Sequence, residues 1–155
     1  MNYRKVNCKL WEDAYFMELH PVSMTIYFYL VTNSHSTAEG YYKLPILYVV
    51  NDLLPMFKTV EERNGKSTRD YTELIREQLT KLEEQQLISY DDETQVVLIK
   101  DALKLNVTMN EKHRSAAIKR IMDVPYSELI DEFLELADTY DGLLAEDIRK
   151  GMDTV

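Results

Sequence analysis

The spacing of hydrophobic residues changes sharply once, within the stretch from Thr68 to Lys100. In its first half the apolar side chains recur at helical spacing, at positions 71, 74, 75, 79 and 82, with mostly polar residues between them. Ser67 or Thr68 can cap this helix, and acidic residues in its first turn suit the helix dipole. Two β-rich runs then follow, residues 87–90 and 95–99, and the turn-forming residues 91–94 separate them. The pattern predicts one helix followed by a two-stranded hairpin.

The hydrophobic runs before this stretch predict further elements. Residues 3–10 alternate weakly and suggest an extended segment, and residues 11–19 suggest a short helix. We expect Trp11 to anchor it in the core and Cys8 to be a small buried side chain. The apolar run 22–32 after Pro21 predicts a buried helix, and the polar residues 33–40 predict a loop. Residues 41–44 predict a strand that can pair with the hairpin as a third strand. Pro45 opens a helix to about residue 54, and we expect Pro55 to interrupt or end it.

The C-terminal third predicts helices. Asn110 can cap a helix that runs to Met122, and Pro125 begins a second helix. Asp141 and Gly142 end the second helix, and a short last helix is expected over 143–150. The helix after Pro125 has an apolar stripe and an opposite acidic face. Two interpretations of the stripe stay open, since it can pair two protomers or close over the chain's own core. The stripe consists of Tyr126, Leu129, Ile130, Phe133, Ala137 and Tyr140.

Together these elements predict a mainly α fold with a small antiparallel β-hairpin or sheet, an α+β arrangement. A helix that runs straight into a hairpin is what a winged helix-turn-helix needs, with the helix as the groove reader and the hairpin as the wing. We therefore expect a winged helix-turn-helix domain over residues 1–106. Residues 107–155 would form a helical C-terminal extension that is acidic from residue 125.

The net charge of −9 over 155 residues counts against a simple nucleic-acid binder, because the neutralisation of phosphates drives such binding. The charge is unevenly distributed. Residues 1–124 have 16 basic and 18 acidic side chains, a net of −2, whereas residues 125–155 have 2 basic and 9 acidic ones, a net of −7. A local basic face on the nearly neutral first part is therefore compatible with the composition.

The sequence lacks the patterns of several chemistries. The three histidines are scattered, and a single cysteine excludes an internal disulfide and the usual cysteine-pair zinc sites. No GxxxxGK[ST] loop, GxGxxG turn or GxSxG elbow is present. We therefore expect a non-enzyme with no cofactor and no metal site. With neither a signal peptide nor an apolar run of about 20 residues, we expect a cytoplasmic protein that does not enter a membrane.

Several short stretches resemble the N-terminal winged-helix region of phage replication proteins, the replisome-organiser or DnaD-like group. The resemblance spans roughly residues 3–136. It implies a DNA-binding module that recognises a phage origin and helps to recruit the replication machinery of the host, in whose cytoplasm it would act. The matching stretches are 3–5, 11–13, 19–21, 29–33, Gly40-Tyr41-Tyr42-Lys43-Leu44-Pro45, 82–91, 94–100 and Val124-Pro125-Tyr126-Ser127-Glu128-Leu129-Ile130.

The first functional hypothesis is binding of double-stranded DNA through the helix that precedes the hairpin. Residues near the start of such a helix reach base edges, while hydroxyls and amides hold phosphates. Arg69 and Arg76 are the best candidates for guanine contacts. Three basic residues of the helix after Asn110 form either a second phosphate-facing patch or a solvated helix face. The candidate DNA-binding residues are Lys66, Ser67, Thr68, Arg69, Thr72, Arg76 and Thr80, followed by Lys112, Lys119 and Arg120.

The second hypothesis is an acidic protein–protein interaction module, such as an inhibitor, an adaptor or a DNA mimic, that keeps the winged-helix fold without binding DNA. The acidic segment 125–155 would then dock on a basic partner such as a replication protein. The turn residues 91–93 are also acidic, where a phosphate contact would require Lys or Arg. Pairing of protomers through the apolar stripe would give a homodimer, which suits two-fold DNA sites.

Overall fold

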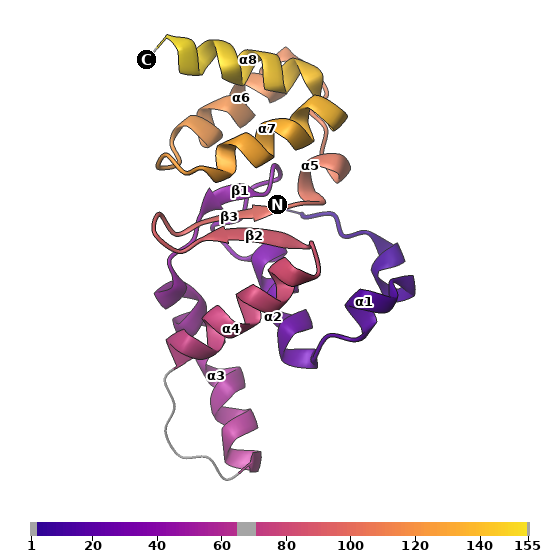
Figure 1. The fold of residues 1–155 in the computed structure, drawn as a ribbon, viewed down its shortest axis with the longest axis vertical. Coiled ribbons are helices and arrows are strands. Elements are labelled where there is room, and N and C mark those ends of the chain that lie inside the picture. The colour runs from indigo at the N-terminus through magenta and orange to yellow at the C-terminus, as the bar shows by residue number, and fades with distance from the viewer. Residues whose placement is uncertain (1–2, 65–70, 155) are drawn as a thin grey trace.

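The structure is a computed structural model that describes residues 3–64 and 71–154, with the side chains of residues 60–64 outside the description. The described part is mainly helical and has a small three-stranded antiparallel sheet (Figure 1). The helical elements are η1 (Cys8–Glu12), α1 (Ala14–Met17), α2 (Pro21–Thr32), α3 (Ile46–Asn64), α4 (Tyr71–Glu84), α5 (Ala102–Leu105), α6 (Glu111–Met122), α7 (Leu129–Tyr140) and α8 (Gly142–Asp153). The strands are β1 (Tyr41–Lys43), β2 (Ile88–Asp91) and β3 (Val96–Ile99).

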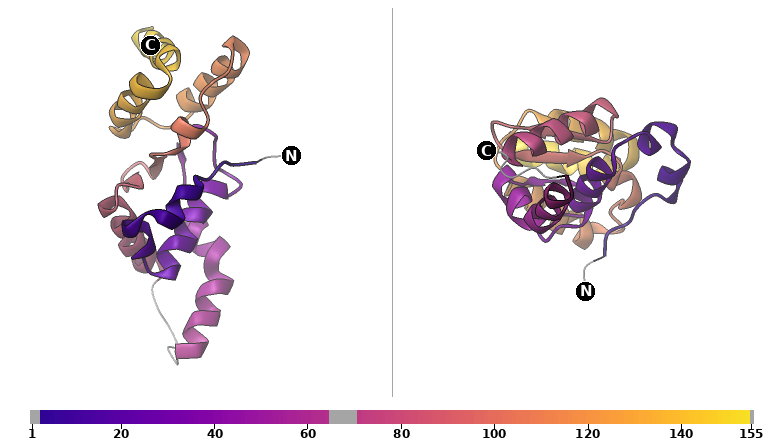
Figure 2. Two further views of the ribbon diagram at one scale, coloured as in Figure 1. Left: turned by 90° about the vertical axis from the view of Figure 1, so that its right-hand side faces the viewer. Right: turned by 90° about the horizontal axis from the view of Figure 1, so that it is seen from below.

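The sheet lies between two groups of helices. Its strand order is β1-β3-β2, so the central strand β3 pairs with both neighbours, and Leu98 lies opposite Tyr41 on one side and Ser89 on the other. All four residues of β3 are buried, because the sheet is covered on both faces. Figures 1 and 2 show α2, α3 and α4 on one side of the sheet and α5 to α8 on the other. The expected third strand is thus confirmed.

Alternate residues of the strands supply two hydrophobic cores, as the two-residue period of a strand requires. Tyr42, Val97 and Ile99 point into the first core, with α2, α3 and α4. Tyr41 and Leu98 point into the second core, which α5 to α8 complete. The C-terminal helices therefore build their core on the sheet of the preceding part of the chain. The first core also includes Phe16, Ile26, Leu30, Val49, Phe57, Ile75, Leu79 and Leu82, and the second Ile121, Ile130, Phe133, Ala137, Leu144 and Ile148.

The apolar stripe expected after Pro125 packs mainly on the chain's own sheet. Ile130, Phe133 and Ala137 are buried, and the ring of Phe133 lies 5.4 Å from that of Tyr41, centroid to centroid. The interpretation of the stripe as a cover for the chain's own core is therefore confirmed. The helix begins at residue 129 rather than at Pro125, because Ser127 is buried in the preceding turn, where its Oγ accepts a hydrogen bond from the Leu129 amide.

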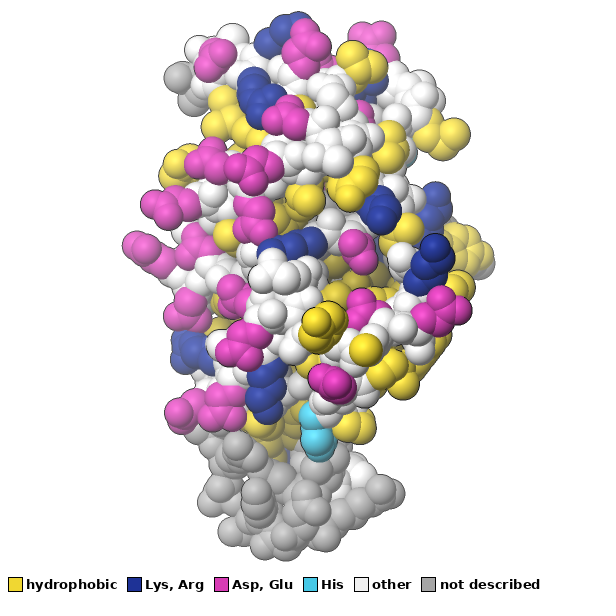
Figure 3. Space-filling view, turned by 45° about the vertical axis from the view of Figure 1, so that its right-hand side comes forward, with side chains coloured by type: hydrophobic (Ala, Val, Ile, Leu, Met, Phe, Trp, Pro, Cys, Tyr) yellow, Lys and Arg dark blue, Asp and Glu magenta, His cyan; other side chains and the backbone are white. Residues whose placement is uncertain are grey.

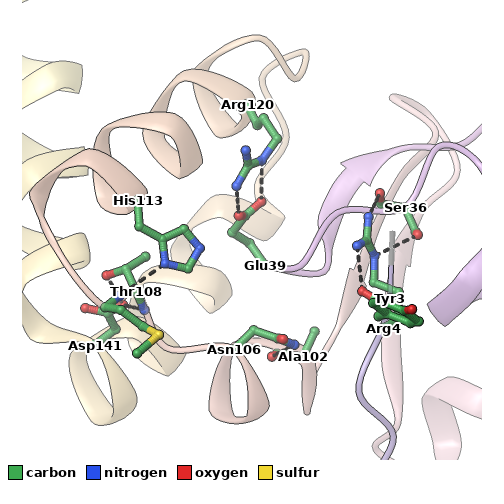
Figure 4. Close-up of polar contacts among 11 residues, drawn as sticks. Tyr3, Arg4, Ser36, Glu39, Ala102, Asn106, Thr108, His113, Arg120 and Asp141 are labelled. Atoms are coloured by element: carbon green, nitrogen blue, oxygen red, sulfur yellow. Dashed lines mark hydrogen bonds and ion pairs between the residues drawn. The ribbon is translucent and has the colours of Figure 1, made fainter. Parts of the chain in front are cut away.

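Polar groups fasten the C-terminal helices to one another and to the sheet. Asp141 caps α8 and also accepts hydrogen bonds from the amide and the hydroxyl of Thr108, at 2.8 and 2.6 Å, in the segment before α6. Figure 4 shows this contact, and beside it the guanidinium of Arg120 on α6, which donates to both carboxylate oxygens of Glu39, just before β1. The buried Asp141 and Glu39 thereby hold α6 and α8 at defined positions.

Three expectations about the first half of the chain were wrong. Trp11 is 60 % exposed, because Phe16 fills the core position and the Trp11 ring covers it from outside, 6.0 Å away. Cys8 is exposed on η1, where Leu10 is the buried residue. Pro55 does not end α3, which continues through it to residue 64. The continued helix buries Phe57 and stacks its ring on Tyr71 of α4, at 5.2 Å, which offsets the backbone hydrogen bond lost at proline.

Candidate nucleic-acid interface

Helix α4 is held by its inner face and presents its outer face to solvent. Ile75, Leu79 and Leu82 are buried in the first core, and Gln78 accepts a hydrogen bond from the hydroxyl of Ser23 on α2. This anchoring is the amphipathic pattern expected from the sequence. The exposed side chains of α4 are Glu73, Arg76, Glu77, Thr80, Lys81 and Glu84, so the face is accessible but has three carboxylates against two cations.

Arg76 is paired with the turn that joins β2 and β3. Its Nε lies 2.9 Å from Oδ1 of Asp92, and the two side chains are 52 % and 60 % exposed. An ion pair this exposed contributes only about 0–1 kcal/mol in water, because solvent screens it. The ion pair with Asp92 by itself therefore competes only weakly with a phosphate or a guanine for Arg76. The contact also places the β2–β3 turn beside the outer face of α4.

The acidic residues of the β2–β3 turn are partly explained by the turn itself. Asp91 accepts hydrogen bonds from the Thr94 hydroxyl at 2.6 Å, the Ser127 hydroxyl at 2.7 Å and the amide of Glu93 at 3.1 Å. These bonds, led by the one from Thr94, hold the pKa of Asp91 below its usual range. Asp91 is thus a structural acceptor that fixes the turn and ties it to the segment before α7. Nothing in its spacing along the sequence indicated this role, because the bond from Ser127 spans 36 positions.

The structure separates the candidate DNA-binding residues into groups. Thr72, Arg76 and Thr80 lie on α4, where the Thr80 hydroxyl donates to the Arg76 carbonyl at 3.0 Å. Lys112, Lys119 and Arg120 lie on α6, across the sheet from α4, so the two groups do not form one continuous surface (Figure 1). The candidates Lys66, Ser67, Thr68 and Arg69 lie outside the described residues.

Arg120 has a structural partner that sequence reasoning did not find. Its Nε donates to Oε2 of Glu39 at 3.2 Å and its Nη2 donates to Oε1, a two-point contact across 81 positions of the chain (Figure 4). The hydrogen bonds to Glu39 raise the pKa of Arg120. Because Glu39 is 2 % exposed, a phosphate that took Arg120 would leave a buried carboxylate without its partner. All three α6 candidates are exposed residues, but the charge of Arg120 is held by a buried carboxylate. Lys112 and Lys119 are therefore the more accessible cations.

Among the side chains that Figure 3 colours, Lys and Arg are dispersed and form no concentrated positive region. Acidic side chains run down one side of that face, with single Lys and Arg side chains among them. Within residues 3–59 and 71–154, no group of three or more His, Cys, Asp or Glu side chains could hold a metal ion. Among the helices that the structure describes, none has the length and apolarity needed to cross a membrane.

Comparisons with known proteins add no relative. No family model matches the chain, and no curated protein or solved structure matches it either.

Proposed function

We propose that the protein binds double-stranded DNA through α4 and the β2–β3 hairpin, in the manner of a winged helix-turn-helix. The observation that supports this most is the arrangement of α4. The helix packs on α2 and α3 through its inner face, leaves its outer face exposed, and leads directly into the hairpin of a sheet ordered β1-β3-β2. In helix-turn-helix proteins the corresponding helix enters the major groove and its N-terminal half contacts base edges.

Arg76 is the base-reading residue in this proposal. It lies on the exposed face of α4, where a guanidinium can donate two hydrogen bonds to O6 and N7 of guanine. Thr72 and Thr80 lie one turn before and after it and supply hydroxyls for phosphates. Arg69 and the other candidates at 66–68 precede α4 in the sequence and keep their proposed role as contacts at the start of the reading helix.

The attraction for phosphate has to come from outside the described face of α4, which has more carboxylates than cations. The segment that leads into α4, residues 58–69, has four basic residues (Lys58, Arg63, Lys66 and Arg69) and two acidic ones (Glu61 and Glu62), a net of +2. With about three phosphates neutralised, the logarithm of the binding constant should fall by about three per tenfold rise in salt. We therefore expect weak, strongly salt-dependent binding to random duplex DNA and tighter binding to a preferred sequence.

Fluorescence anisotropy tests the proposal. The labelled probes are a random duplex and a duplex enriched from a randomised library by repeated selection on the protein. Arg76→Ala should weaken binding to the enriched duplex about 5- to 150-fold, the range that one bidentate guanine contact provides. Asp92→Asn should strengthen it about 2- to 5-fold, because it removes the competing partner of Arg76.

Arg149→Ala is the matched control. Arg149 is an exposed arginine of α8 that is also paired with a carboxylate, that of Asp138, but it belongs to the helices on the other side of the sheet. Its removal changes the net charge by the same amount and should leave affinity within about twofold. Equal weakening by Arg76→Ala and Arg149→Ala would show that total charge, and not α4, determines binding.

The excess of carboxylates on α4 specifically favours a second candidate function, an acidic protein-interaction module that keeps this topology without binding DNA. Exposed acids at the start of α7 and along it extend the acidic surface. They are Glu128, which directly precedes the helix, and Asp131, Glu135 and Asp138 within it. In that case a folded sample binds neither duplex at low salt. A role in starting the replication of a phage genome is proposed only on the resemblance described above, and the homodimer stays a prediction.

A further inference from the structure

A groove with two lobes lies where the segment that joins α6 to α7 passes the sheet. The first lobe has a volume of about 370 Å³ and the second of about 510 Å³, and both are lined by Tyr126 and Ser127. The Ser127 hydroxyl donates to Asp91 of the β2–β3 turn, which fixes the groove's floor to the sheet. In Figure 1 this segment and the turn lie at the same left-hand edge of the molecule. No residue of α4 lines the groove, although the second lobe shares the β2–β3 turn with the proposed DNA interface.

The first lobe is mostly apolar. Its walls include Ile121, Met122, Val124 and Met152, contributed by α6, the joining segment and α8. Tyr41 of β1 also lines it. Tyr41 is 2 % exposed as a whole residue, and no hydrogen bond joins its hydroxyl to another described residue. The hydroxyl is nevertheless open to solvent in the lobe, because Thr37 Oγ1 is the buried polar side-chain atom without a partner among the described residues. Burial raises the pKa of the Tyr41 hydroxyl to about 12, so it is a neutral donor at physiological pH. An occupant with a carbonyl oxygen would replace water as its acceptor.

The second lobe is acidic. Asp91, Glu93 and Glu128 line it, and the carboxylates of Glu93 and Glu128 belong to exposed residues. Tyr126 lies between the lobes and is 73 % exposed, whereas Ile130, Phe133 and Ala137 of the same apolar stripe are buried. An exposed aromatic ring beside carboxylates is a favourable environment for a lysine or arginine side chain, which can pair with the acids and lie over the ring.

We propose that this groove binds an extended segment of another protein in which an apolar and a basic side chain lie two positions apart, on the same side of the segment. An apolar side chain of the segment fills the first lobe, and a basic side chain reaches the acids of the second lobe. A backbone carbonyl of the segment accepts a hydrogen bond from the Tyr41 hydroxyl. Side chains on one side of an extended strand recur about every 7 Å, which suits two lobes that share Tyr126.

Charge selects this occupant over the others. Nucleic acid is disfavoured, because its phosphates would face the carboxylates of the second lobe. A second copy of this chain is disfavoured by its own net charge of −9. The inference does not rest on DNA binding, because the two surfaces share the β2–β3 turn but the first lobe is lined chiefly by α6, α8 and the segment that joins α6 to α7. It can therefore hold when the DNA proposal fails, and fail when that proposal holds.

NMR of the full chain with ¹³C-labelled methionine methyl groups tests the proposal. The probe is the synthetic peptide Ser-Leu-Ser-Lys-Ser-Leu-Ser, whose leucines and lysine lie on one side of an extended chain, and the control peptides replace the lysine by glutamate or both leucines by serine. Met122 and Met152 line the first lobe, whereas Met17 and Met109 are exposed elsewhere and serve as internal controls. We expect the first pair of signals to shift with the lysine–leucine peptide alone and the second pair to stay in place.

Variants then identify the groups responsible. Tyr126→Ala should weaken peptide binding at least tenfold, and Glu93→Gln with Glu128→Gln about fivefold. Tyr41→Phe removes only the unpaired hydroxyl, so we expect affinity to fall about 2- to 10-fold while the melting temperature stays equal or rises. Asp131→Asn with Glu135→Gln removes two exposed charges of α7 that do not line the groove, and affinity should stay within twofold.

Four outcomes would overturn the proposal. The first is an absence of shifts at Met122 and Met152 at millimolar peptide. The second is equal shifts at all exposed methionines, which would indicate adhesion without a site. The third is shifts caused by duplex DNA, and the fourth is shifts that grow with protein concentration alone, which would assign the groove to a second copy.

Discussion

Arg120→Ala offers the sharpest test of how the C-terminal helices are held on the sheet. Arg120 on α6 donates two hydrogen bonds to Glu39, whose side chain is 2 % exposed. The substitution removes both donors and leaves a carboxylate buried beside β1 without a partner. Because the pair joins two segments that are 81 positions apart, its loss also loosens the contact between α6 and the rest of the fold.

The magnitude follows from burial. Breaking a fully buried ion pair by removing one partner costs about 3–5 kcal/mol. The Arg120 side chain is 42 % exposed, so water reaches part of the pair, and we reduce the expected loss of unfolding free energy to about 2–4 kcal/mol. For a chain of this size, that corresponds to a fall of about 5–15 °C in melting temperature. Adding Glu39→Gln to Arg120→Ala should restore about 1–2 kcal/mol, since a neutral amide is cheaper to bury than a carboxylate.

Urea unfolding followed by circular dichroism at 222 nm measures these free energies. Arg149→Ala is the matched control, because Arg149 makes a similar two-point contact with Asp138, at 2.7 Å for each bond, between side chains that are both about half exposed. Because solvent screens this exposed pair, the control should lose much less stability than Arg120→Ala. If Arg120→Ala lowers the unfolding free energy no more than Arg149→Ala does, the structural role given to Glu39 is refuted.

Two further predictions concern the second core and the β2–β3 turn. Phe133→Ala should lower the unfolding free energy by about 3–5 kcal/mol in the same urea assay, because the ring is fully buried against the sheet; a loss below about 1 kcal/mol would contradict this packing. Asp91 has a pKa lowered chiefly by its bond from Thr94, so its carboxylate stabilises the fold above the unfolded pKa, near 4, and this contribution disappears as pH falls below that value. Asp91→Asn should therefore flatten the stability profile below about pH 4, and an unchanged profile would contradict the assignment.

Short-range patterns predicted the elements well where the local signal was strong. The helix α4 and its hairpin followed from the change of hydrophobic period, and Asn110 caps α6 as expected, with its side chain accepting from the amide of His113 at 2.8 Å. The end of α3 was missed for a physical reason. The sequence shows what Pro55 loses within its own helix, but not that the helix beyond it brings Phe57 against Tyr71.

The candidate site was harder to predict, because its chemistry depends on partners that are distant in the sequence. Arg76 and Arg120 looked alike as exposed helical arginines. The structure pairs the first with an exposed turn residue and the second with the buried Glu39, and the pair with Glu39 is the more costly one to break. Tyr126 was expected in an apolar stripe, but the turn around Ser127 directs it outward. Neither distinction is encoded in local spacing.

Amide chemical-shift mapping with duplex DNA tests the central proposal most directly. The ¹⁵N-labelled protein is titrated at about 20 mM salt with the selection-enriched duplex, and the shifted amides are located on the structure. We expect the shifts to be concentrated on α4, at Thr72, Arg76 and Thr80, and in the β2–β3 turn. These shifts should disappear as the salt concentration is raised. A folded sample without shifts there, or with shifts confined to α6, would contradict DNA binding through α4.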